Sequence, residues 1–134
     1  MNIQSDIKEV NAPAEKVFNF LSDYNNFKEL MPEQVIKWES DEKHGRFTIK
    51  DMTELGMRIE DASPGKYVLL HSDGKVPFEF TLKVILDEIS SSLTKVQIIF
   101  DGKPAPLIAM MAKRPLGNLV NHMVEKITIL VPGQ

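Results

Sequence analysis

The side chains best suited to chemistry in this sequence are its three histidines, which lie far apart along the chain. His44 falls in a turn-like segment, His71 at the end of an apolar run, and His122 in a helical pattern. A histidine becomes a base or a metal ligand when a second group holds and orients it. None of the three has a histidine or carboxylate at the i, i+4 spacing of a helical metal site. We therefore expect solvated or structural histidines, no metal and no cofactor.

Nucleophilic catalysis has no better support, because the chain lacks cysteine and any Gly-x-Ser-x-Gly sequence. We expect no catalytic residue, and three side chains remain as possible polar contacts to a ligand. Trp38 and Tyr67 each carry a polar group on an apolar ring. Asp61 has the strand parity of Met57 and Ile59 and could point inward, but a lone carboxylate near a strand end favours a rim or turn position.

Composition excludes several function classes. The 134 residues predict one domain, spanning residues 1–134. A net charge of -3, with Lys113-Arg114 as the one notable basic pair, argues against a nucleic-acid partner. The N-terminus has no apolar signal segment, and no run of about 18 apolar residues could span a membrane. We expect a cytoplasmic protein without membrane insertion, and its oligomeric state stays open.

The elements that position these side chains follow from hydrophobic periodicity. Residues 2–10 alternate as a half-buried strand does, and two short helices follow before Pro32. Short, turn-rich links then favour antiparallel hairpins between strands. The six further strands that we predict are residues 35–40, 45–52, 55–62, 66–72, 77–86 and 94–101.

The last segment is a helix with one broad apolar stripe. With Leu116 as origin, apolar residues up to Val131 fall within an arc of roughly 140°. On a straight helix Met110 and Met111 would centre roughly 170° away from that stripe. Pro115 removes a donor and clashes with the carbonyl of Met111. We therefore predict a kink or split at residues 113–116, with a separate helical piece before it whose methionines gate a cavity or contact a partner.

This order of elements predicts an α+β fold, in which a seven-stranded curved antiparallel sheet wraps around a long C-terminal helix. Residues 11–32, NAPAEKVFNFLSDYNNFKELMP, closely resemble the opening of the START/SRPBCC superfamily. PFEFTLKV (77–84) and MMAKRPLGNLV (110–120) resemble the late strand and final helix of a small, mostly bacterial, polyketide cyclase/dehydrase-like branch. The resemblance covers essentially the whole chain. It implies the helix-grip fold, with two short helices between strands 1 and 2, but it carries over no catalytic signature.

The resemblance also implies a cavity between sheet and helix for an apolar small molecule. We expect binding or carriage of a hydrophobic ligand that resembles a lipid, a quinone or a polyketide. A cyclase or dehydrase-type enzyme, an interaction module without ligand, and a solid core are the alternatives. The residues that we expect to line the cavity are Phe47, Met57, Ile59, Phe78, Phe80, Leu82, Val96, Ile98, Phe100, Met110, Met111, Leu116, Val120 and Met123.

Overall fold

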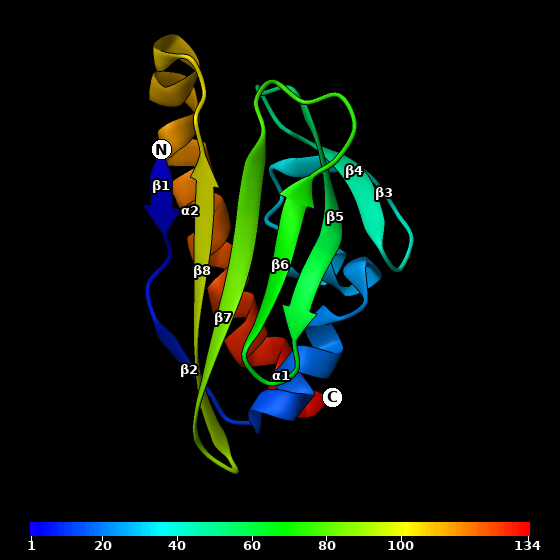
Figure 1. Cartoon of the computed structure of the whole chain (residues 1–134), viewed down its shortest axis with the longest axis vertical. Coiled ribbons are helices and arrows are strands. Elements are labelled where there is room, and N and C mark those ends of the chain that lie inside the picture. The colour runs from blue at the N-terminus through cyan, green and yellow to red at the C-terminus, as the bar shows by residue number, and fades with distance from the viewer.

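A curved antiparallel sheet wraps one side of a long C-terminal helix in the computed structural model, which describes residues 1–134 (Figure 1). The strand order is β1-β8-β7-β6-β5-β4-β3, and β2 also pairs with β8. The helix α2 runs behind the sheet, and the short helices lie at its C-terminal end (Figure 1). The elements are β1 Asn2–Gln4, β2 Lys8–Val10, α1 Ala14–Leu21, η1 Tyr24–Leu30, β3 Val35–Ser40, β4 His44–Ile49, β5 Glu54–Ser63, β6 Tyr67–Ser72, β7 Phe80–Ser90, β8 Leu93–Gly102, α2 Pro106–Leu130 and η2 Val131–Gly133.

The predicted α+β architecture is confirmed, with one difference in the first strand. That strand is divided into β1 and β2, which both pair antiparallel with β8. Ser5 lies between them, and its backbone N–H donates to the carbonyl of Ile98. Its side-chain oxygen accepts from the Ile98 N–H at 2.8 Å. The Ser5 hydroxyl thus accepts a hydrogen bond from the β8 backbone in place of a backbone carbonyl. Both short strands therefore remain paired with β8.

The core forms where the concave face of the sheet meets α2. On β7 and β8, alternate residues such as Leu82 and Ile98 point inward, as the period of a strand requires. They join the α2 stripe, which includes Leu116, Val120 and Met123, in one cluster of buried side chains. At one end α1 and η1 close this core with Val17, Leu21, Tyr24, Phe27 and Leu30.

The predicted split at residues 113–116 is wrong, because α2 is one continuous helix with Pro115 inside it, whereas the alternative of a kink stays a prediction. Proline leaves the carbonyl of Met111 without its helical donor. Met111 is 66% exposed, so water can satisfy that carbonyl. The helical geometry itself holds: Met110 and Met111 lie away from the core stripe and are exposed. The error was the assumption that both halves of the helix must face the sheet.

Gly117 offers a test of helix α2 itself. A methyl group at this position would meet only the Ile3 side chain, at 4.0 Å, and φ is not positive. Gly117→Ala should therefore raise the free energy of unfolding by about 0.5–1 kcal/mol, because alanine loses less backbone entropy in a helix. Urea denaturation measures the change.

Gly45→Ala is the matched control for this test. A methyl group there would lie 2.5 Å from the Glu39 carbonyl oxygen and 2.7 Å from the Tyr24 ring, so this variant should be destabilised. A loss of stability in Gly117→Ala would contradict the packing described for α2.

Candidate functional site

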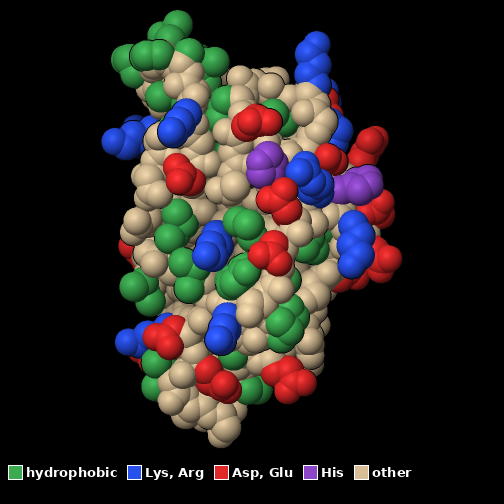
Figure 2. Space-filling model, in the orientation of Figure 1, with side chains coloured by type: hydrophobic (Ala, Val, Ile, Leu, Met, Phe, Trp, Pro, Cys, Tyr) green, Lys and Arg blue, Asp and Glu red, His purple; other side chains and the backbone are tan.

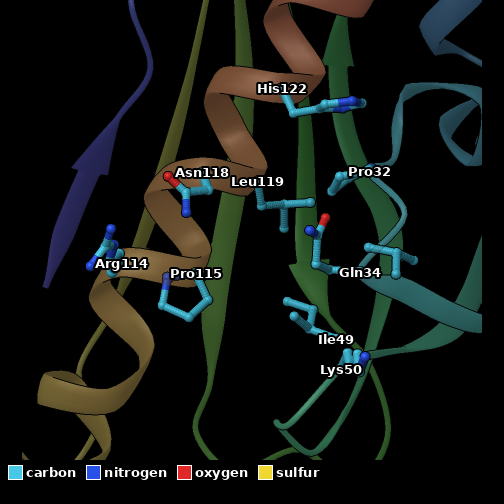
Figure 3. A pocket seen from close by; sticks show the side chains of 10 residues that line it. Pro32, Gln34, Ile49, Lys50, Arg114, Pro115, Asn118, Leu119 and His122 are labelled. Carbon is cyan, nitrogen blue, oxygen red and sulfur yellow. The ribbon is translucent and has the colours of Figure 1, made fainter.

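A groove of about 450 Å³ lies between α2 and the sheet edge at β3 and β4 (Figure 3). Its apolar surface comes from prolines and aliphatic side chains of both walls, and polar side chains stand along it. The lining residues are Pro32, Gln34, Val35, Ile49, Lys50, Arg114, Pro115, Asn118, Leu119 and His122.

The helical wall of the groove is a stripe along one side of α2. Pro115, Asn118, Leu119 and His122 recur at spacings of three and four residues, which places them on adjacent turns of one face. In Figure 3 Leu119 and His122 extend from α2 toward Pro32 and Gln34, which lie just before β3. This stripe of groove residues lies next to the buried stripe of α2 and shares Leu119 with it, so the groove runs along the edge of the core.

The opposite wall is held by backbone hydrogen bonds. The Lys50 N–H donates to the Gln34 carbonyl at 2.7 Å, and the Val35 N–H donates to Pro32 at 3.0 Å. Val35 also pairs with Ile49 across the β3–β4 ladder. These backbone hydrogen bonds and the β3–β4 pairing hold the backbone of this wall in place. The positions from which its side chains enter the groove are therefore fixed.

Two cations at the groove are free of charged partners. Lys50 and Arg114 are exposed, and neither forms an ion pair with a carboxylate. The amide side chains of Gln34 and Asn118 also make no hydrogen bond within the protein, although they line the same groove. Guanidinium and ammonium groups bind carboxylate and phosphate through charge-assisted hydrogen bonds. The groove therefore combines an apolar floor with donors suited to an anion.

His122 has one ring nitrogen engaged and one free. Its Nδ1 lies 2.9 Å from the carbonyl oxygen of Leu30, which makes Nδ1 the donor. The neutral ring then carries its lone pair on Nε2, which has no partner within the protein. Glu125, three residues further along α2, pairs instead with Lys8 at 3.6 Å. His122 thus ties α2 to η1 and leaves an acceptor beside the groove.

The residues predicted to line a cavity do not line this groove. Most are buried and pack against one another within the core, namely Phe47, Met57, Phe80, Leu82, Val96, Ile98, Phe100, Leu116, Val120 and Met123. Ile59 and Phe78 are partly buried against the same cluster. Met110 and Met111 are exposed. These side chains are thus part of the buried cluster, and their role in lining a cavity stays a prediction.

Trp38 is held in a stack of aromatic rings. Its ring lies between Tyr24 and Phe47, with centroid distances of 5.3 Å and 5.4 Å. Its indole N–H donates to the Ser40 hydroxyl at 2.8 Å. A register shift in β3, where Lys37 has a φ of 54°, turns Trp38 toward the core while Ile36 stays exposed. The polar group of Trp38 is therefore already bonded within the protein.

Asp61 and Tyr67 pair with each other, outside the groove. A β-bulge between Ile59 and Asp61 shifts the register of β5 against β6, so Asp61 does not follow the parity of Met57 and is exposed. The Tyr67 hydroxyl donates to Asp61 at 2.8 Å. This hydrogen bond raises the pKa of the Tyr67 phenol, and burial and the repulsion between carboxylate and phenolate add to the effect. Lys83 lies over the Tyr67 ring at 4.6 Å.

The sequence contained a signal for the groove that apolar periodicity alone does not detect. Arg114, Asn118 and His122 are spaced by four residues, along the polar border of the apolar stripe. The other wall gave no such signal, because Gln34 and Lys50 are distant in sequence and meet only through the β3–β4 pairing.

Solved structures with a similar fold match nearly the whole chain. A START superfamily protein from Mycobacterium smegmatis superposes with a TM-score of 0.70 at 13% identity, over 98% of this chain and 97% of its own. The protein XoxI from Bacillus cereus gives a TM-score of 0.74 at 11% identity, over 98% and 95%. The di-domain ARO/CYC BexL from the BE-7585A biosynthetic pathway gives 0.72 at 14% identity, over 98% of this chain and 46% of BexL.

These similarities show the fold alone, since the identities are low. The START-like fold expected from residues 11–32, 77–84 and 110–120 is confirmed. No family model matches the chain, and no curated protein matches its sequence.

Tyr24, beside Trp38, gives a prediction about the aromatic stack. Its hydroxyl is buried without any hydrogen-bond partner, and burial raises the pKa of this phenol above its ordinary value of 10.0. Tyr24→Phe keeps the ring and removes the unsatisfied hydroxyl, so it should raise the free energy of unfolding by about 1 kcal/mol. Above pH ~10 the unfolded tyrosine loses its proton before the native one, so the stability of the parent protein should fall faster than that of the variant.

Urea denaturation at neutral and alkaline pH measures both effects. Tyr67→Phe is the control, because it removes a hydroxyl that does have a partner and should be neutral or slightly destabilising. Clear destabilisation by Tyr24→Phe would mean that the hydroxyl is hydrogen-bonded in solution.

Proposed function

We propose that this chain, with its START-like helix-grip fold, binds a small amphipathic molecule that carries an anionic group. The apolar part of the molecule lies along the floor of the groove between α2 and β3–β4. The observation that carries the proposal is the position of Lys50 and Arg114, two cations without ion-pair partners, beside that floor. The proposal assigns the expected hydrophobic ligand to this groove, beside the buried core.

The size and lining of the groove support this proposal. About 450 Å³ lies within the roughly 300–1,000 Å³ of small-molecule pockets. Prolines and aliphatic side chains form the floor, so an apolar ligand body gains about 25 cal/mol for each Å² removed from water. Gln34 and Asn118 offer further hydrogen bonds, which would set the orientation of the ligand.

The comparisons support a ligand-binding role in general terms. The chain shares its fold with a START superfamily protein and with the ARO/CYC BexL. The anionic group of the ligand is inferred from the side chains of this groove and from nothing in those proteins.

A second candidate function is acid–base chemistry on the bound molecule, and His122 favours it. Leu30 orients the ring through Nδ1, so Nε2 is available as a base without any further rearrangement. A cyclase or dehydrase needs such a group within hydrogen-bond reach of the substrate. Binding remains the leading proposal, because no second titratable group is hydrogen-bonded to His122.

The cations are tested with anilinonaphthalene sulfonate, an aromatic anion, in a fluorescence titration. The Lys50→Gln/Arg114→Gln variant should bind this probe at least about tenfold more weakly, which corresponds to ~1.4 kcal/mol. The loss arises because two charge-assisted contacts to the sulfonate disappear. Uncharged anilinonaphthalene should bind the variant and the parent protein equally.

The control variant is Lys66→Gln/Lys95→Gln, which removes two exposed cations that lie outside the groove. It should bind the sulfonate as the parent protein does. Equal weakening in both variants would show that only the overall charge matters and would contradict the proposal. Native mass spectrometry of protein purified from its own host should in addition reveal a co-purifying anionic amphiphile.

A further inference from the structure

The first turns of α2 carry the most exposed large apolar side chains of the molecule. Leu107, Met110 and Met111 are 69%, 79% and 66% exposed, and their i, i+3, i+4 spacing places them on one face. We refer to these three residues as the α2 tip. Figure 2 shows hydrophobic side chains gathered where this end of α2 projects from the body of the molecule. An apolar patch kept in water at a projecting end indicates an interaction site.

A small apolar hollow continues the surface of the tip. It measures about 190 Å³, and Met111, Ile108 and Ala112 form its helical side. Met52, Pro77 and Phe78 face them, and Asp51 and Thr53 complete the lining. Because five of the eight lining residues are hydrophobic, the tip and the hollow together offer a surface suited to hydrocarbon.

The charge around the tip is opposite in sign to that of the molecule. Residues 102–124 contain Lys103, Lys113 and Arg114 and no acidic residue. The chain as a whole has a net charge of -3, so the remaining residues carry a net charge of -6. None of the three cations forms an ion pair. These three cations therefore flank the exposed apolar side chains along the chain, while Asp51 lines the hollow and Glu79 and Asp101 line a pocket together with Lys103.

We infer that the α2 tip docks on the surface of an anionic lipid membrane. Leucine and methionine side chains can enter the boundary between headgroups and acyl chains, while the flanking cations meet lipid phosphates. No helix of this protein is both long and apolar enough to cross a bilayer, so the contact is made at the surface. The three cations favour an orientation in which the tip faces the membrane.

A second copy of the chain fits this surface less well. Three side chains on a projecting helix end are few for a stable interface, which buries about 800 Å² on each partner. Two copies that met tip to tip would also bring two sets of three positive charges together. An anionic membrane fits both the small apolar area and the positive charge of the tip. A few apolar side chains can enter its interface without a large contact area, and its lipid phosphates supply the opposite charge.

This inference does not rest on the groove as a binding site, although the two are neighbours. Arg114 and Pro115 line the groove and follow the tip directly on α2. A molecule docked by its tip would hold the mouth of the groove near the headgroups.

Co-sedimentation with vesicles tests the inference. The intact protein should bind vesicles of phosphatidylcholine with phosphatidylglycerol at low salt. Its binding to vesicles of pure phosphatidylcholine should be at least tenfold weaker. Met110→Gln/Met111→Gln should reduce the binding at least tenfold, and so should Lys103→Gln/Lys113→Gln. These side chains are exposed, so circular dichroism should show the same fold in every variant. Binding of anilinonaphthalene sulfonate should persist in both variants, which separates this test from that of the groove.

The matched control is Ile129→Gln, which removes an apolar side chain that is 61% exposed at the other end of α2. It should bind vesicles as the parent protein does. Absence of binding to anionic vesicles at low salt would overturn the inference, and so would an equal loss in Ile129→Gln. A concentration-dependent dimer in sedimentation velocity that the methionine variant dissociates would also overturn it, in favour of a second copy as occupant.

Discussion

The packing of one helical stripe against the concave sheet is the contact on which the rest of the molecule depends. Leu116, Leu119, Val120, Met123 and Ile127 of α2 are buried in the same cluster as the inward residues of β4 to β8. Apolar burial drives this contact, and nothing else ties the middle of the sheet to the helix so extensively. The sheet must curve to cover the stripe, and the seven-membered strand order follows from hairpins laid side by side around it.

The position of open space follows from the same contact. Large inward side chains such as Phe47, Phe80 and Phe100 belong to the buried cluster between the sheet and the helix. The β3–β4 edge meets the flank of α2 instead, at residues that include Pro115 and Asn118. A groove between an apolar core and water is necessarily lined by both kinds of side chain. This mixed lining is the reason why the proposed ligand is amphipathic rather than purely apolar.

Fold and site differ in how far the sequence predicts them, and particular residues show why. Alternation along residues 77–86 and 94–101 predicted β7 and β8, because a strand with one buried face must alternate. Asp61 does not share a face of the sheet with Met57, because a bulge adds a residue to β5. Neither the propensity nor the periodicity of the sequence predicts such a bulge. Periodicity also identifies which side chains are buried but not whether they enclose a ligand or fill the space. Gln34 and Lys50 could not be joined to the site, since only tertiary pairing brings them near α2.

The apolar residues before Pro115 show why the predicted split of the helix was wrong. Met110 and Met111 lie off the core stripe, and a break at Pro115 was predicted so that the segment carrying them could turn toward a cavity mouth. The continuous helix removes the need for that break, and the methionines then face water with cations around them. Single exposed apolar side chains are common on protein surfaces. A cluster of them at one end of a helix is unusual and points to an interaction site. In this molecule the exceptions share one helix with the groove, so α2 serves the core with one face and two surfaces with the others. A change in the length or register of α2 would alter all three at once, because one continuous helix through Pro115 carries the buried stripe, the groove wall and the tip.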